Sequence, residues 1–174
     1  MKTRIFWICV GLFFSSSAAM AQYAKGDKLW NIGIGLNSYY NGGIPLNTSF
    51  EVGVTDEISV GAELDYLSYR YNFAGTRYGF TSFYLAGRGS YHFNKLLNLK
   101  EDALDIYAGA GLGFRSFSWN ESNNFSGLGN VYGNGAFLAI HVGTRYYFSD
   151  KIGAYLELGA GGASNATLGL AFKF

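Results

Sequence analysis

A period-two alternation of large apolar residues with small or polar ones runs along the chain from residue 30 to residue 174. In Trp30–Leu36, every even position is large and apolar and every odd position is Gly or Asn. Such alternation is the pattern of β-strands with one apolar face. After residue 21 no apolar run approaches the roughly 20 residues of a membrane-spanning helix, and only residues 95–104 offer a plausible helical stretch. The chain is therefore predicted to be all-β.

The alternation predicts eight strands, at residues 30–36, 48–54, 58–66, 83–93, 106–115, 138–148, 152–159 and 166–174. The connections alternate in length: 55–57 and 149–151 are tight turns, whereas 38–46, 67–79 and 116–135 are long and rich in Asn, Ser, Gly and Tyr. Residues 94–103 form a longer turn and 160–164 a short loop, which depart from this alternation. An even number of strands with short and long connections at opposite ends is typical of a membrane barrel. We predict an eight-stranded antiparallel transmembrane up-and-down β-barrel.

Alternation alone does not say which face points outward, and a soluble lipocalin-like barrel would put the apolar face inside. The polar face is rich in Gly, which suits a crowded interior better than a solvated strand surface. Phe174 closes the apolar row of the last strand. Aromatic residues also gather near strand ends, as in the interfacial girdles of membrane barrels. The predicted girdle is Trp30, Tyr91, Phe93, Tyr146, Phe148 and Phe172. These features favour an outward apolar face.

The first 21 residues have the order of a secretory signal peptide. Lys2 and Arg4 precede the apolar run 5–14, and small residues end in Ala19-Met20-Ala21. Cleavage after Ala21 would leave residues 22–174 as a single barrel domain; a retained membrane anchor is the alternative. The only cysteine, Cys9, would leave with the peptide, so the exported chain has no disulfide.

Nine charged residues fall on the inward face of the predicted barrel, and unpaired buried charges cost several kcal/mol each. They are therefore expected to form a network, with Glu63–Arg88 and Arg145–Glu157 as the best-placed pairs. Tyr84, Tyr107, Tyr147 and Tyr155 would fill the gaps and plug the lumen; a small diffusion pore is the alternative. The nine residues are Glu51, Glu63, Asp65, Arg88, Asp105, Arg115, Arg145, Glu157 and Lys173.

The signal peptide, the eight alternating strands and the terminal Leu168-x-Leu170-x-Phe172-x-Phe174 together resemble the OmpA/OmpX-like porin family of small outer-membrane β-barrels. The resemblance implies a monomer in the outer membrane of a Gram-negative bacterium, in contact with lipid and lipopolysaccharide. It also implies that Phe174 serves as the signal read by the barrel-assembly machinery during insertion.

Little in the sequence points to catalysis or to a cofactor. Gly109-Ala110-Gly111-Leu112-Gly113 is similar to a nucleotide-binding loop, but no helix follows it. His92 and His141 are the only histidines, which are too few to suggest a metal site. The formal net charge of +1 gives no basic surface for binding nucleic acid. Some eight-stranded barrels modify lipid A, and His141 would be the best candidate base, but Ala139 and Gly143 flank it on its face. We expect no enzyme, with a lipid-modifying one as the less favoured alternative.

Any binding activity is expected to lie in the long connections. The segment 116–135 exposes Phe117, Trp119, Phe125 and Tyr132 among Asn, Ser and Gly, the mixture that binding loops use. Alternatively, these rings fold back onto the barrel rim or lie in lipopolysaccharide. The sequence thus predicts a structural or surface-interaction role and does not identify the ligand.

Overall fold

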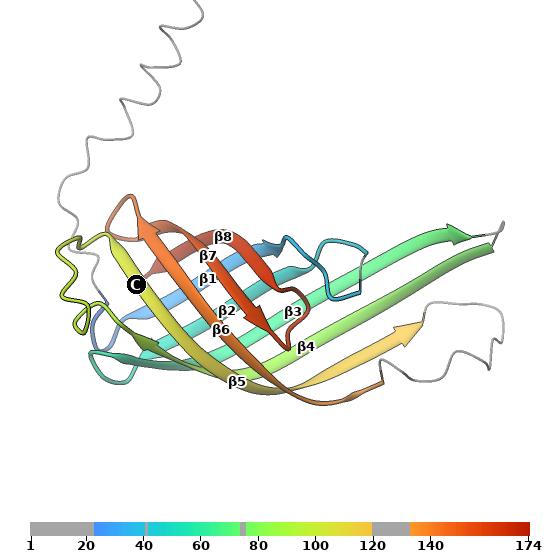
Figure 1. The fold of residues 1–174 in the computed structure, drawn as a ribbon, viewed down its shortest axis with the longest axis horizontal. Coiled ribbons are helices and arrows are strands. Elements are labelled where there is room, and N and C mark those ends of the chain that lie inside the picture. Colours follow the sequence, from blue (N-terminus) through green and yellow to red (C-terminus); the bar gives the residue numbers. More distant parts are fainter. Residues whose placement is uncertain (1–22, 41, 74–75, 120–132) are drawn as a thin grey trace, which may run out of the picture.

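The computed structural model describes residues 23–40, 42–73, 76–119 and 133–174, which form eight antiparallel strands closed into a barrel (Figure 1). Each strand pairs with its neighbours in sequence, and β1 closes the barrel by pairing with β8, from Leu29↔Lys173 to Gly35↔Thr167. The predicted fold class is therefore confirmed. The predicted signal peptide lies outside the described residues. The strands are β1 (Lys28–Gly35), β2 (Leu46–Gly53), β3 (Ile58–Phe73), β4 (Thr76–His92), β5 (Leu104–Trp119), β6 (Gly135–Tyr147), β7 (Ile152–Ala160) and β8 (Ala166–Lys173).

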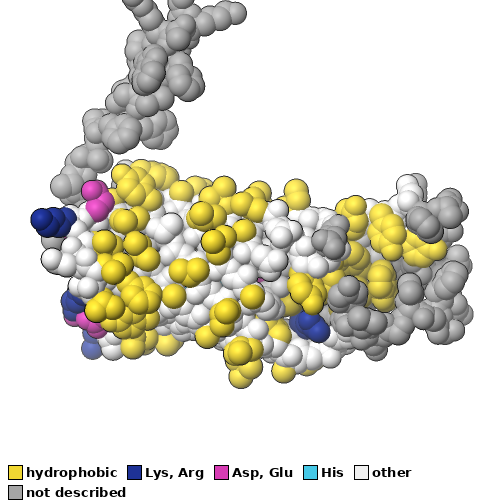
Figure 2. All heavy atoms as spheres, viewed as in Figure 1, with side chains coloured by type: hydrophobic (Ala, Val, Ile, Leu, Met, Phe, Trp, Pro, Cys, Tyr) yellow, Lys and Arg dark blue, Asp and Glu magenta, His cyan; other side chains and the backbone are white. Residues whose placement is uncertain are grey.

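Side chains alternate between the outer and inner faces of the wall, as the pleat of a strand requires. Leu85 and Leu112 point outward and keep 60% and 67% of their surface exposed, whereas the neighbouring Tyr84 is 2% exposed. Figure 2 shows the resulting spread of hydrophobic side chains over the barrel wall. The outward orientation of the apolar face is therefore confirmed, and the soluble alternative with an apolar interior is wrong. Among the residues placed here, none belongs to a helix long and apolar enough to cross a membrane.

Large inward side chains fill the barrel, and glycine makes room for them. Tyr84, Tyr107, Tyr147 and Tyr155 are all buried, as predicted. A Cβ at Gly143 would lie 2.6 Å from the ring of Tyr107, closer than side chains pack, so glycine leaves the space that this ring occupies beside β6. The glycines of the inner face thus leave space for a few bulky side chains.

The two ends of the barrel differ. At the turn end, where β1, β3, β5 and β7 begin, residues 54–57 and 148–151 form tight turns and 93–103 a longer one. The chain end at Phe174 and the segment 23–27 lie at this same end (Figure 1). The other end is called the loop end below.

The helix considered for residues 95–104 is wrong. One helical turn forms, in which the Leu97 amide donates to the Phe93 carbonyl (2.8 Å). Asn98 then adopts a left-handed φ of 48°, which cannot continue a right-handed helix. The Asn94 side chain also binds the backbone of Leu104 and Ile106, which holds the segment as a compact turn.

The prediction of a long loop at 67–79 is also wrong. Strands β3 and β4 run on as a hairpin, with Tyr69 opposite Phe80 and Tyr71 opposite Tyr78. Their neighbours stop earlier, since β2 pairs with β3 only up to Tyr66 and β6 pairs with β5 only up to Arg115. Residues 67–73, 76–82 and 116–119 therefore form a three-stranded sheet that projects past the barrel wall, called the extension below (Figure 1).

Candidate functional site

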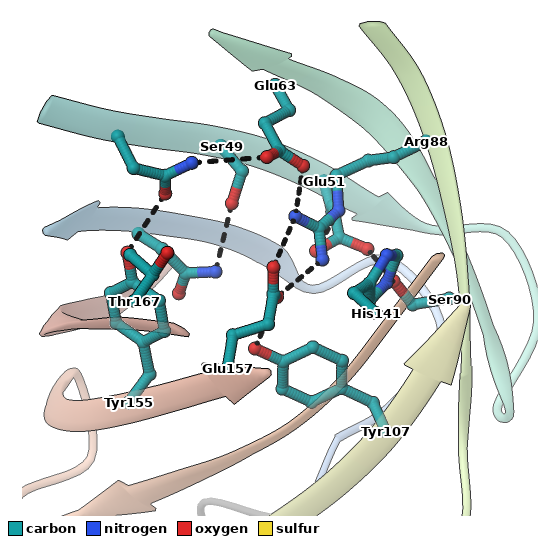
Figure 3. A network of polar contacts seen from close by, with 12 residues as sticks. Ser49, Glu51, Glu63, Arg88, Ser90, Tyr107, His141, Tyr155, Glu157 and Thr167 are labelled. Atoms are coloured by element: carbon teal, nitrogen blue, oxygen red, sulfur yellow. Dashed lines mark hydrogen bonds and ion pairs between the residues drawn. The ribbon is translucent and has the colours of Figure 1, made fainter. Parts of the chain in front are cut away.

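Several charged residues of the inner face meet in the lumen, and Figure 3 shows Glu51, Glu63 and Glu157 gathered around Arg88. Ion pairs join six of the nine predicted residues, contributed by six different strands, into one lumen network. Its members are Glu51 (β2), Glu63 (β3), Arg88 (β4), Asp105 (β5), Arg145 (β6) and Glu157 (β7).

Arg88 is the cation of the upper half of the network, nearer the loop end. Its Nη1 lies 2.7 Å from Glu63 Oε2, which is one of the two expected pairs. Its Nη2 lies 2.8 Å from Glu157 Oε2, and its Nε lies 3.4 Å from Glu51 Oε1. Strands β4 and β7 are not neighbours in the sheet, so the bond from Arg88 to Glu157 crosses the lumen.

Arg145 is the cation of the lower half and is fully buried. Its Nη2 binds Glu51 Oε1 (3.0 Å), its Nη1 binds Asp105 Oδ2 (2.9 Å), and its guanidinium lies 3.9 Å from the centre of the Tyr107 ring. The expected Arg145–Glu157 pair is wrong. The register places Glu157 opposite Gly143 rather than Arg145, which brings its carboxylate up to Arg88 and to the Tyr107 hydroxyl (3.0 Å).

Three predicted members lie outside these ion pairs. Asp65 accepts hydrogen bonds from the Asn47 side chain (2.6 Å) and from the Ala163 amide (3.1 Å). Arg115 Nε donates to the Gly133 carbonyl at the loop end (3.3 Å). Lys173 lies at the turn end, with its Nζ 3.7 Å from Asp27 Oδ2.

Neutral side chains that were not predicted as members complete the network. Asn31 accepts a hydrogen bond from Arg145 Nε (3.1 Å), and Asn47 donates to both Glu63 and Asp65. Ser59 and Ser90 both donate to Glu51 Oε2, at 2.6 and 2.7 Å. For Asn31, Ser59 and Ser90 the sequence signal was a position on the inward face, the same signal that marked the charged residues, whereas Asn47 precedes the predicted strand 48–54.

The lumen also brings together a serine, a histidine and an aspartate. Ser59 Oγ lies 3.0 Å from His92 Nε2, and His92 Nδ1 lies 2.7 Å from Asp105 Oδ1. This is the order of groups in a hydrolytic triad. It forms around His92 and not around His141, which the sequence analysis considered as the base.

The hydrogen bonds of Ser59 argue against a nucleophilic role. A serine hydroxyl has one proton, and Ser59 donates it to the Glu51 carboxylate. His92 Nε2 must then be the donor toward Ser59 and has no lone pair with which to accept the serine proton. Ser90 likewise donates its one proton to Glu51, so His141 Nε2 is the donor to Ser90 (2.9 Å). Ser59, His92 and Asp105 are also buried, which leaves no room for a substrate.

A small cavity remains beside the upper half of the network. It has a volume of about 20 Å³, room for about one water molecule, and is lined by Glu63, Asp65, His141 and Glu157 among others. Within the described part of the chain, no group of three or more His, Cys, Asp or Glu side chains is arranged to hold a metal ion.

The predicted girdle residues lie near the turn end, on the outer face. Trp30 and Phe172 pack with ring centroids 5.7 Å apart, and Tyr91 and Phe93 with centroids 5.0 Å apart. Tyr146 and Phe148 expose nearly half of their surface. Phe174 also lies at this end, with its backbone paired to Lys28 and its side chain 62% exposed.

The aromatic contact residues expected in the 116–135 loop are placed differently. Phe117 and Trp119 belong to strand β5, so their assignment to a loop is wrong; Phe125 and Tyr132 lie outside the described residues. The rings of Phe117 and Trp119 join an aromatic cluster on the lumen-side face of the extension, called the aromatic platform below. It consists of Tyr69, Tyr71, Tyr78, Phe80, Phe117 and Trp119, with neighbouring centroids 5.1–6.1 Å apart.

The extension reverses the polarity of the barrel wall. On the wall, apolar side chains such as Leu64, Leu85 and Leu112 point outward. Beyond Tyr66 on β3 and beyond Phe114 on β5, the outward positions become Ser68, Arg70, Asn72, Ser116 and Ser118, while the rings occupy the opposite face. The apolar outer surface of β3 and β5 therefore ends at this height.

A tyrosine from the β1–β2 connection contacts the lumen tyrosine Tyr84 at the loop end. The Tyr40 hydroxyl lies 2.7 Å from that of Tyr84, and its ring packs on Phe80 and Phe117 with centroids 5.2 and 5.4 Å away. Tyr40 thus connects the lumen to the aromatic platform.

Comparisons with known proteins support the fold and do not identify a family by sequence. No protein-family model and no curated protein matches the chain. Among solved structures, it is similar to OprG of Pseudomonas aeruginosa (TM-score 0.62, 11% identity, covering 88% of this chain and 98% of that one). It is also similar to the N-terminal barrel domain of Pseudomonas aeruginosa OprF (TM-score 0.53, 18% identity, 88% and 100% covered).

A third similar structure is Ail of Yersinia pestis in complex with the heparin analogue sucrose octasulfate (TM-score 0.51, 12% identity, 86% and 99% covered). The predicted resemblance to small eight-stranded outer-membrane barrels is therefore confirmed at the level of the fold.

Proposed function

We propose that this protein is a monomeric outer-membrane barrel of a Gram-negative bacterium, with its turn end in the periplasm and its loop end at the cell surface. The observation that carries this proposal is the reversal of polarity at Tyr66, because an apolar wall that becomes polar-outward at one height fits a bilayer boundary. The predicted signal peptide agrees with export through the periplasm. The girdle residues would then lie at the inner interface of the membrane, and Phe174 would serve in insertion.

We propose further that the lumen does not conduct. An eight-stranded barrel is just wide enough for its interior to be filled by side chains. Here the ion pairs of Arg88 span the lumen, four tyrosines fill the space around them, and Tyr40 contacts Tyr84 at the loop end. The cavity of about 20 Å³ beside Glu63, Asp65 and Glu157 is far too small for a channel. These features favour a scaffold over the alternative of a diffusion pore.

Planar-bilayer recordings test this part of the proposal. We expect the purified protein to give rare, small openings or none. A steady, large single-channel current would contradict the filled lumen. A barrel of known conductance, reconstituted in the same lipid, serves as the positive control.

The interaction role is proposed to lie on the aromatic platform. Tyr69, Tyr71 and Trp119 each keep more than a third of their surface exposed at the loop end, and Arg70 is exposed on the other face of the same sheet. Tyr, Trp and Arg are the side chains that dominate binding energy at interfaces. The Ail complex with a sulfated sugar supports testing anionic carbohydrate first.

Binding to the reconstituted protein can be measured with sucrose octasulfate, a neutral oligosaccharide and a panel of matrix proteins. Tyr71→Ala and Trp119→Ala are each expected to weaken any binding that the unmodified protein shows by roughly 1–3 kcal/mol, the cost typical of an important interface residue. Ser68→Ala, on the opposite face of the extension, is the matched control and should leave binding unchanged. Full binding by both aromatic variants would show that the platform is not the contact surface.

A lipid-modifying enzyme is less well supported. Among the described residues, the hydrogen-bonded series Ser59–His92–Asp105 is enclosed in the lumen, and Ser59 donates its proton to Glu51. A site that acts on lipid should instead open onto the outer face of the wall.

A further inference from the structure

The segment before β1 enters the barrel at the turn end. The ring of Tyr23 stacks on the ring of His92, with centroids 3.5 Å apart and planes 5° from parallel. Its hydroxyl donates to the Ile58 carbonyl (2.6 Å), and the Thr55 carbonyl is 3.1 Å away. Tyr23 is only 7% exposed although it precedes the first strand. Residues that precede the first strand of a domain are often poorly ordered unless contacts hold them, so these contacts fix Tyr23 in place.

The residues that follow Tyr23 are fastened to the end of β2 and to the β2–β3 turn. The Gly26 amide donates to the Gly53 carbonyl (3.0 Å), and the Gly53 amide donates to the Asp27 carbonyl (2.9 Å). The Lys25 amide donates to Asp56 Oδ1 (3.3 Å). The path also depends on glycine at position 53, where a Cβ would lie 2.7 Å from the Ala24 carbonyl oxygen and 2.9 Å from the Tyr23 hydroxyl.

The residue beneath Tyr23 is the first member of a buried polar chain. His92 binds Asp105 and Ser59, and these in turn bind Arg145 and Glu51. The low dielectric of the interior strengthens the hydrogen bonds of this chain, and water that entered would compete for them. Desolvation of the Tyr23 hydroxyl, together with the nearby carboxylates of Glu51 and Asp105, raises the pKa of Tyr23 well above its usual value. The hydroxyl therefore stays protonated and able to donate.

We propose that residues 23–27 are a strap that closes the turn end of the lumen, with the Tyr23 ring as the stopper over the His92–Asp105–Arg145 chain. The strap and Tyr40 would then seal the two ends of the same lumen network. The inference goes beyond the proposed surface role, since it concerns the opposite end of the barrel.

Cysteine accessibility tests the strap directly, because the only native cysteine, Cys9, belongs to the predicted signal peptide. Ser59→Cys places a thiol under the stopper at a fully buried position of nearly the same size. The protein is expressed as the full chain, purified from membranes and treated with a small cationic methanethiosulfonate. The rate of modification is compared between Tyr23, Tyr23→Phe and Tyr23→Ala backgrounds.

We expect Tyr23→Ala to speed the reaction at Ser59→Cys by about tenfold or more, since loss of the stopper favours local opening. Tyr23→Phe keeps the stacked ring and should react at a rate close to the parent. Ser82→Cys, buried at the other end of the lumen near Tyr40, is the matched control and should not respond to any change at Tyr23. Equal rates at Ser59→Cys in the Tyr23 and Tyr23→Ala backgrounds would overturn the proposal. An equal acceleration at both cysteines would also overturn it, because that result means general loosening.

A second measurement covers the case in which Ser59→Cys disturbs folding. Hydrogen exchange of backbone amides is compared in the cysteine-free mature chain with and without Tyr23→Ala. Faster exchange confined to residues 58–61 and 90–92 supports the strap. Unchanged exchange there, or a uniform increase that includes residues 80–84, contradicts it.

Discussion

Replacing Arg88 by alanine is expected to destabilise the folded barrel by roughly 3–5 kcal/mol, the cost of leaving buried charges without their partner. Arg88 binds Glu63 and Glu157 and lies close to Glu51, so its removal leaves carboxylates from three strands facing one another. The free energy of unfolding can be measured by denaturant titration in lipid vesicles, followed by the fluorescence of Trp30 and Trp119.

Two variants make this result interpretable. Arg70→Ala removes an exposed arginine from the outer face of the extension and should change the free energy of unfolding by less than about 1 kcal/mol. The triple variant Arg88→Met, Glu63→Gln, Glu157→Gln removes the uncompensated charges together with the cation and should recover much of the loss. A neutral effect of Arg88→Ala would mean that water fills the lumen and solvates the carboxylates.

Leu112→Arg is expected to cost about 2–4 kcal/mol, as charged residues do on the lipid face of a membrane barrel. Leu112 is 67% exposed, so the same change on a protein in water would be nearly neutral. The expected loss therefore arises from the bilayer and not from packing. It is measured by the same titration in vesicles.

Ser116→Arg is the matched control for this experiment. Ser116 lies on the same strand and the same face as Leu112, but beyond the height at which the outward side chains become polar. Its substitution should cost about 0–1 kcal/mol. If both variants cost the same, the proposed membrane boundary at Tyr66 is misplaced.

Much of the fold was predictable from the sequence because strand geometry is local. Each residue of a strand points to the opposite face from its neighbour, so Leu85 and Leu112 could be assigned to the outside and Tyr84 and Glu63 to the inside without knowing which strands pair. The inward charges and the four lumen tyrosines follow from this rule alone. The Ser59, Asn31 and Asn47 positions obeyed the same rule, but a single small polar residue on an inward face does not say what it binds.

Which side chains meet was decided by the register of the strands and by the position of each residue along the barrel axis. Both depend on the whole barrel. Arg145 and Glu157 are on neighbouring strands, but the pairing places Glu157 opposite Gly143, and its partner Arg88 comes from across the lumen. The extension was predicted as a loop because its apolar residues lie on the inward face, opposite to the pattern of the wall. Its strand structure becomes evident only from the pairing of Leu67, Tyr69 and Tyr71 with β4. The stacking of Tyr23 on His92 joins residues 69 positions apart. Alternation along one strand determined which way each side chain points, whereas only closure of the barrel, which sets the stagger of all eight strands together, decided which side chains meet.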